Sequence, residues 1–184
     1  FSISGDRLTY VGNKKKGELV GDVTLYQKGM ELKTEKISFD LDSNIIFYNE
    51  TAEVKDNKLR LVSTKGVYSL DTKIFRFTEN VKADHNLLEI ITDSLDYITS
   101  EKSMSFRGPS NITKSDLIIY SEDGAYDPKR NLMTLNKKSS IYQDQYEIKA
   151  DSISCKLDTE YSQAFSNVSI LDTIHKMIIF GDTA

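Results

Sequence analysis

The segment Leu59–Ala83, LRLVSTKGVYSLDTKIFRFTENVKA, decides the fold, because most of the remaining chain repeats its pattern. Apolar residues recur at intervals of 29 residues. The clearest columns are Tyr10, Phe39, Tyr68, Tyr97, Tyr126 and Cys155; Ile3, Leu32, Leu61, Ile90, Ile119, Ile148 and Met177; Leu19, Tyr48, Phe77, Phe106 and Leu135; and Leu25, Val54, Ala83, Ile112, Ile141 and Ile170. A fixed period of this length indicates stacked supersecondary units that cannot bury their apolar faces alone.

Within each unit the apolar pattern alternates with a period of two residues. Ile74 and Arg76 point to one side of a strand, and Phe75 and Phe77 point to the other. This alternation is typical of half-buried strands. Short runs of Asp, Asn and Ser separate the strands, and short polar turns join antiparallel neighbours. We therefore expect six hairpins, with strands of roughly 10 residues each.

The first strand of each unit changes its apolar parity at a small residue that is mostly followed by an acid. These pairs are Gly5-Asp6, Thr34-Glu35, Ser63-Thr64, Thr92-Asp93, Ser121-Glu122 and Ala150-Asp151. A loss of parity indicates a β-bulge, and a bend at the same height in every strand folds the sheet into two layers. A metal site would need more ligands than one carboxylate per strand, so we interpret the pairs as structural.

These patterns predict an all-β fold in which 29-residue, two-strand repeats form an elongated, twisted antiparallel structure, open at both ends. We expect one domain over residues 1–184, belonging to a longer chain. The apolar edge Met177–Phe180 carries no proline or inward lysine, so it favours strand pairing with another copy or continuation of the sheet.

Composition and motifs exclude several classes of function. The net charge of −4 argues against nucleic-acid binding, and we interpret Lys14–Lys16 as a solvated turn. The single cysteine, Cys155, forms no internal disulfide and fits a buried apolar role. No apolar run reaches the ~18 residues of a membrane helix. His85 and His175 do not recur, and no nucleophile, phosphate-loop or metal motif is present, so we expect neither catalysis nor a cofactor.

The aromatic and aliphatic columns face one interior, which leaves two interpretations open at this point. The interior is either a plain core or a groove for acyl chains, each buried CH₂ contributing about 0.8 kcal/mol. The candidate lipid-contacting residues are Tyr10, Leu19, Phe39, Tyr48, Tyr68, Phe77, Tyr97, Phe106, Tyr126 and Leu135.

The repeated motif consists of a small-acid pair, an apolar residue and an aromatic residue, as in Gly5–Tyr10 and Thr92–Tyr97. It resembles the sequences of the OstA family. So does the following strand with its ending "G-x-V" or "N-V", as in Gly21–Val23 and Asn80-Val81. This family comprises the periplasmic lipopolysaccharide-transport bridge protein and the N-terminal domain of its outer-membrane translocon partner. The resemblance extends over essentially the whole chain.

The resemblance implies a β-jellyroll that carries the lipid A acyl chains of lipopolysaccharide across the periplasm toward the outer membrane. It also implies end-to-end strand pairing with like domains, a periplasmic location with association to the outer membrane, and no catalytic residues. The alternative is a structural, self-assembling β-repeat module without lipid cargo.

Overall fold

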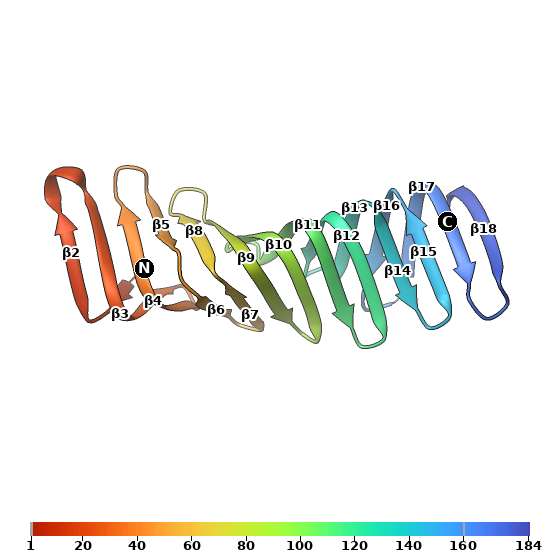
Figure 1. Ribbon diagram of the computed structural model, residues 1–184, viewed down its shortest axis with the longest axis horizontal. Coiled ribbons are helices and arrows are strands. Elements are labelled where there is room, and N and C mark those ends of the chain that lie inside the picture. Colours follow the sequence, from red (N-terminus) through yellow and green to blue (C-terminus); the bar gives the residue numbers. More distant parts are fainter. Residues whose placement is uncertain (1, 160) are drawn as a thin grey trace. The chain divides into compact units, whose positions relative to one another are not determined.

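The computed structural model describes residues 2–159 and 161–184 (Figure 1). The regular structure of these residues consists of 18 strands and one short 3-10 helix, η1 (Gly12–Lys14). Neighbouring strands pair antiparallel, as β3 (Lys16–Gln27) does with β4 (Met30–Asp40). The predicted all-β, antiparallel class is confirmed.

The chain divides into two compact units. One comprises the chain up to Asn86 together with Ser94–Ser100, and the other comprises Leu87–Asp93 together with the chain from Glu101 onward. Strand β10 (Leu88–Ile98) therefore contributes its beginning to the second unit and its end to the first. A division into compact units does not test whether they fold separately, so the single domain over residues 1–184 stays a prediction.

The structure contains strands of 11 or 12 residues, such as β3, β4 and β10, and strands that are broken into two short pieces (Figure 1). The remaining strands of the first unit are β1 (Ser2–Ser4), β2 (Arg7–Val11), β5 (Ile45–Tyr48), β6 (Ala52–Asp56), β7 (Leu59–Ser63), β8 (Lys65–Ser69) and β9 (Ile74–His85). Those of the second unit are β11 (Ser103–Lys114), β12 (Leu117–Asp127), β13 (Leu132–Lys137), β14 (Ser139–Gln143), β15 (Tyr146–Ala150), β16 (Ser152–Lys156), β17 (Tyr161–Asp172) and β18 (Met177–Thr183).

The strands bend at the small-acid pairs, as the sequence predicts, but the extra residue lies on the facing strand. Val20 pairs with Lys36 and Val23 with Thr34, so two residues of β3 stand opposite the single Glu35 of β4. This geometry is a β-bulge on β3, which is the second strand of the preceding repeat unit. The assignment of the bulge to the first strand was wrong, because Gly21 takes the positive φ of +86° that the extra residue requires.

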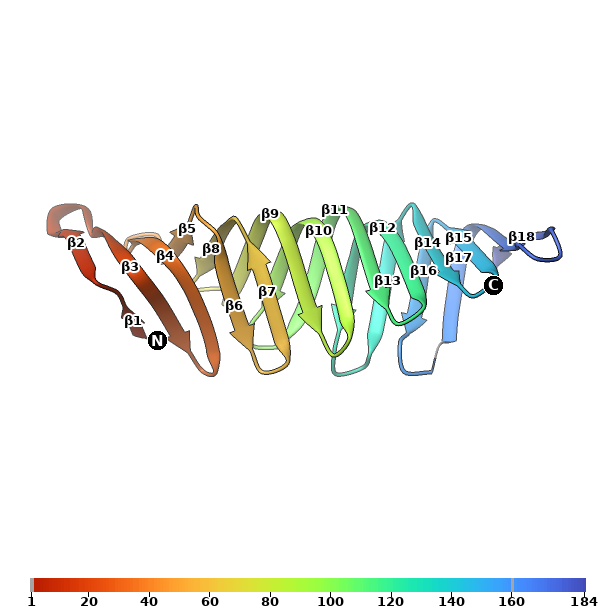
Figure 2. The same ribbon diagram turned by 60° about the horizontal axis from the view of Figure 1, so that its bottom comes forward.

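Each bent strand supplies hydrogen bonds to two layers. In the first unit the beginning of β4 pairs with β6 and its end pairs with β5. The first layer continues from β6 to β7 and the second from β5 to β8, as can be followed in Figure 2. In the second unit the beginning of β12 likewise pairs with β14 and its end with β13. Apolar side chains of the two layers meet in the interior of each unit.

Large aromatic side chains in the interior pack over glycines on the neighbouring strand. Tyr48 lies opposite Gly66 in the first unit, and Phe106 lies opposite Gly124 in the second. A Cβ atom at Gly66 would lie 2.4 Å from the Tyr48 ring, and one at Gly124 would lie 2.4 Å from the Phe106 ring. Glycine at these positions leaves the space into which the ring fits, so the two layers can pack closely.

We expect Gly66→Ala to destabilise the fold by about 1–3 kcal/mol, because the added methyl group overpacks the interior against Tyr48. The matched control is Gly12→Ala, where the nearest atom to a new Cβ is 3.7 Å away, in ordinary contact. Urea denaturation of the two variants and the wild type measures the difference. Equal stabilities of the two variants would contradict the packing described here.

Candidate functional site

The structure places most of the ten predicted lipid-contacting residues inside the two units. Eight of them are no more than 8% exposed. These are Leu19, Tyr48, Tyr68, Phe77 and Tyr97 in the first unit and Phe106, Tyr126 and Leu135 in the second. Phe39 is half-buried, and Tyr10 is 49% exposed and stacks on Phe39 with ring centroids 6.2 Å apart. The columns therefore face the interior, and their role in lipid contact stays a prediction.

An apolar cavity opens among the first strands of the first unit. It has a volume of about 240 Å³, and its lining is entirely apolar. The lining residues are Ile3, Leu8, Leu19, Phe39, Leu41, Ile46 and Leu70. Leu41 and Leu70 lie in polar turns one repeat apart. A leucine that recurs in a polar turn is the sequence signal that could have predicted this cavity. We call this cavity the first mouth.

A second cavity, the second mouth, opens in the second unit. Its volume is about 370 Å³, and its lining combines apolar and polar side chains. The lining residues are Ile141, Gln143, Asp144, Tyr146, Ile148, Tyr161, Ser162 and Ile170. None of them was among the ten predicted residues. Ile141 pairs with Ile148 and Ile148 with Ile170, so one row of isoleucines crosses β14, β15 and β17 along this mouth.

A polar contact joins the two layers within each unit. In the first unit the Tyr97 hydroxyl donates to Asp56 Oδ2 at 2.7 Å, and both residues are buried. Burial, with the adjacent Asp56, raises the pKa of the Tyr97 phenol, so it stays a protonated donor. In the second unit Lys114 Nζ donates to the carbonyl oxygen of Leu157. These contacts satisfy polar groups that would otherwise be costly inside an apolar interior.

Two polar atoms in the first unit are buried without a hydrogen-bond partner in the described part of the chain. They are the hydroxyl oxygen of Tyr68 and Oε1 of Gln27. The Tyr68 side chain is fully buried and contacts Phe75, with ring centroids 5.2 Å apart. Unpaired groups of this kind are uncommon in folded proteins.

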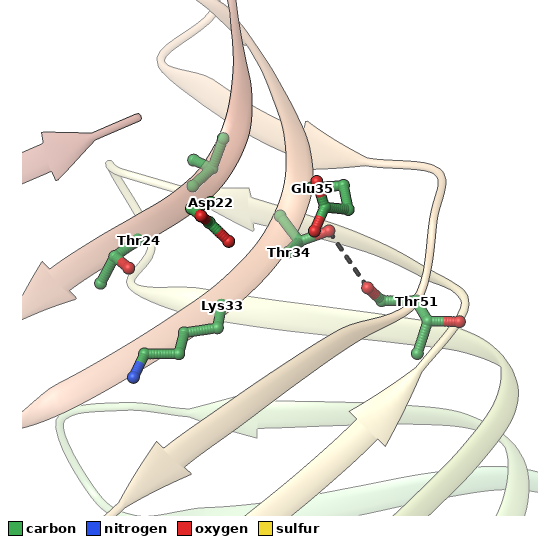
Figure 3. A pocket seen from close by; sticks show the side chains of 7 residues that line it. Asp22, Thr24, Lys33, Thr34, Glu35 and Thr51 are labelled. Carbon is green, nitrogen blue, oxygen red and sulfur yellow. Dashed lines mark hydrogen bonds between the residues drawn. The ribbon is translucent and has the colours of Figure 1, made fainter. Parts of the chain in front are cut away.

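Polar hollows lie on the outside of the bends. Figure 3 shows the one in the first unit, about 450 Å³ in volume, where the Thr34 hydroxyl donates to the Thr51 carbonyl oxygen at 3.1 Å. A hollow of the same kind, about 590 Å³, lies three repeats further on and includes Glu122 in place of Glu35. Because the hollow recurs with the repeat, we interpret it as a consequence of the bend.

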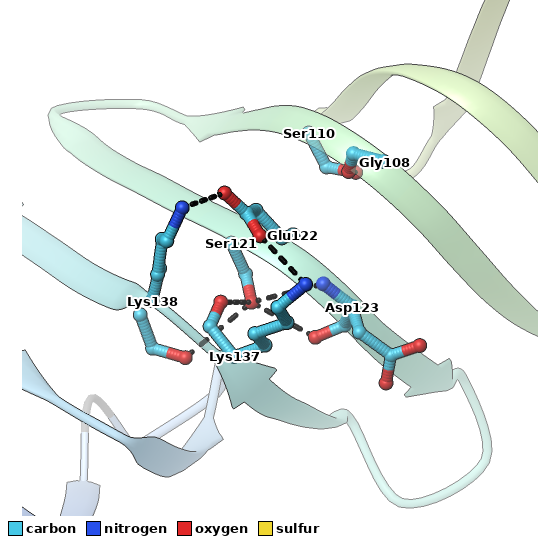
Figure 4. Close-up of polar contacts among 8 residues, drawn as sticks. Gly108, Ser110, Ser121, Glu122, Asp123, Lys137 and Lys138 are labelled. Atoms are coloured by element: carbon cyan, nitrogen blue, oxygen red, sulfur yellow. Dashed lines mark hydrogen bonds and ion pairs between the residues drawn. The ribbon is translucent and has the colours of Figure 1, made fainter.

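The polar groups at the second of these bends satisfy one another (Figure 4). Ser121 Oγ lies 2.8 Å from the Asp123 carbonyl oxygen and 3.0 Å from that of Lys137. The ammonium groups of Lys138 and Lys137 hold the pKa of the Glu122 carboxyl below its ordinary value. Within residues 2–159 and 161–184, no group of three or more His, Cys, Asp or Glu side chains could hold a metal ion.

No helix among the described residues is long and apolar enough to cross a membrane. The described chain is an antiparallel β protein of bent hairpins around apolar interiors, each with a mouth. Residues 1–90 match the family model described as OstA-like protein. The resemblance carried by the repeated motifs is thus confirmed, with the match covering residues 1–90.

The fold is similar to a crystal structure of LptH from Pseudomonas aeruginosa, described as the LptA homologous periplasmic component of the conserved lipopolysaccharide transport device. The TM-score is 0.51 at 12% sequence identity, and the alignment covers 56% of this chain and 78% of LptH. No curated protein sequence matches this chain. The predicted jellyroll class of fold is therefore confirmed.

The two buried tyrosines, Tyr97 and Tyr68, should respond differently to loss of the hydroxyl group. Tyr97→Phe removes a hydrogen bond to a buried carboxylate and should cost about 1–3 kcal/mol of unfolding free energy. Tyr68→Phe removes an unpaired hydroxyl and should change stability by less than about 0.5 kcal/mol, or stabilise the protein. Chemical denaturation of both variants measures this contrast, and equal losses would contradict it.

Proposed function

We propose that this protein binds lipopolysaccharide and carries its lipid A acyl chains in the apolar interior, across the periplasm toward the outer membrane. The first mouth is the observation that carries the proposal, because it is an apolar opening into an interior lined by aromatic columns. The OstA-like match and the similarity of the fold to a periplasmic component of lipopolysaccharide transport support the same cargo and compartment.

Acyl chains suit this opening because its chemistry is apolar and non-directional. Each CH₂ group that leaves water contributes about 0.8 kcal/mol, so even a few methylenes in the mouth outweigh an exposed ion pair of at most about 1 kcal/mol. The sugar and phosphate groups of the lipid would stay in water outside the mouth. No step of this role requires a catalytic group.

We also propose that like domains join end to end through the exposed strand β18. Met177, Ile178, Ile179 and Phe180 are all more than half exposed. Ile179 pairs with Ile170 and so extends the row of isoleucines that crosses the second unit. A strand added at this edge would cover these side chains and complete the backbone hydrogen bonds.

The alternative function, a self-assembling β-repeat module without lipid cargo, is favoured by the close packing of the aromatic columns. Both functions allow strand pairing, but only the transport function requires lipid binding. Lipid-binding measurements therefore separate the two.

Replacing Leu8 by Asp should weaken the binding of lipopolysaccharide at least about tenfold, because it places a carboxylate in the first mouth and removes a leucine contact worth about 1.5 kcal/mol or more. Leu8 is 59% exposed, so the fold should tolerate the change. The matched control is Val67→Asp on β8, a 43% exposed residue that does not line the mouth. Equilibrium binding of labelled lipopolysaccharide measures the effect. The transport function is wrong if folded wild-type protein takes up no lipid.

Replacing Ile179 by Lys should abolish end-to-end assembly, because a charge on an exposed edge strand opposes pairing. Sedimentation of the wild type should reveal assemblies that grow with concentration, whereas the variant should sediment as a monomer. A wild-type protein that is monomeric at every concentration tested would argue against the pairing.

A further inference from the structure

The Tyr68 hydroxyl and Gln27 Oε1 are unpaired, although the residues at the equivalent positions one repeat later are joined by a hydrogen bond. Tyr97 follows Tyr68 by 29 residues, and Asp56 follows Gln27 by 29 residues. The later pair is joined by the 2.7 Å hydrogen bond between Tyr97 and Asp56. The earlier pair makes no such bond, and both of its polar atoms are buried. The repeat thus presents a donor and an acceptor to the interior of the first unit without joining them.

This polar pair lies close to the first mouth. Phe39 and Ile46 line the mouth and pair with each other across β4 and β5. Ile46 pairs in turn with Tyr68 on β8. Because adjacent strands are about 4.8 Å apart, the backbone of Tyr68 lies one strand spacing from that of the lining residue Ile46. An acyl chain that enters the mouth would meet Tyr68 a few carbons from its polar end.

The chemistry of the two atoms restricts the group that could join them. The tyrosine hydroxyl donates a hydrogen bond, and the amide oxygen only accepts one. An ionised carboxylate could not donate to the amide oxygen, and an ammonium group could not accept from the tyrosine. An alcohol does both, and the walls around Tyr68, formed by Ile46 and Phe75, are apolar and buried.

We infer that Tyr68 and Gln27 form a binding site for the hydroxyl group of a hydroxylated acyl chain, and that the protein selects such chains over plain ones. The inference rests on the proposed function, since it concerns acyl chains that enter by the first mouth. The hydroxyl would accept from Tyr68 and donate to Gln27, while the rest of the chain contacts the apolar interior.

The test compares the binding of 3-hydroxytetradecanoic acid and tetradecanoic acid to the full chain by calorimetry. The wild type should bind the hydroxylated acid about tenfold more tightly, because two buried polar groups gain a partner. Tyr68→Phe should reduce this preference to about twofold or less, because the variant lacks the hydroxyl group that donates to the hydroxylated acid. Tyr26→Phe, a control on the exposed face of β3, should keep the full preference, since Tyr26 is 51% exposed.

The outcomes separate the inference from the proposed function. If the wild type binds both acids equally, or if folded Tyr68→Phe keeps the preference, the hydroxyl site is wrong and lipid transport stands. If the folded wild type binds neither acid and no lipopolysaccharide, the proposed function fails and the inference fails with it. Circular dichroism of each variant establishes that it is folded, and Gln27→Leu, which removes the acceptor, should lose the preference as Tyr68→Phe does.

Discussion

The fold depends on residues that adopt positive φ at the bends, in pairs such as Glu79 with Asn80 and Ser166 with Asn167 or singly as at Gly108. Residues other than glycine pay about 1–2 kcal/mol for this conformation. The surrounding structure offsets part of the strain, because Asn167 donates from its side chain to Asp151 Oδ2 at 2.7 Å across the bend, and Asn80 makes the equivalent bond to Thr64 Oγ1. Because of these bends, a single strand forms backbone hydrogen bonds in both layers. Without them the apolar face of each hairpin would lie flat and exposed to water.

The bends create the interior, and the side chains then determine how much of it is free. Glycines such as Gly66 and Gly124 let the rings of Tyr48 and Phe106 fill the space between the layers, so the middle of each unit is tightly packed. Free volume remains at the mouths, where neighbouring strands cover the apolar rows less completely. The proposed transport function therefore places the first contact with lipid at the mouths. Deeper uptake requires the packed aromatic side chains to move aside.

Much of this architecture could be predicted from the sequence, because a 29-residue period and a two-residue alternation constrain both the strands and the faces they bury. The small-acid pairs located the bends, but they did not show which strand carries the extra residue. That depends on the backbone φ angles of both paired strands at the bend. A column also treats Tyr10 and Tyr68 as equivalent, although Tyr10 is half exposed on β2 and Tyr68 is fully buried. The bond between Tyr97 and Asp56 spans 41 residues, which is not a multiple of the period, so no column could reveal it.

The pairing of each strand with strands close to it in the chain has a consequence for folding. Among the described residues, strand β4 pairs with β3, β5 and β6, and β12 pairs with β11, β13 and β14. Because these loops are short, a hairpin can nucleate and the next can be added to it at little entropic cost, which is unusual for β proteins. Evolution can thus lengthen or shorten such a chain by whole hairpins, since each addition needs to match only the surface of the one before it.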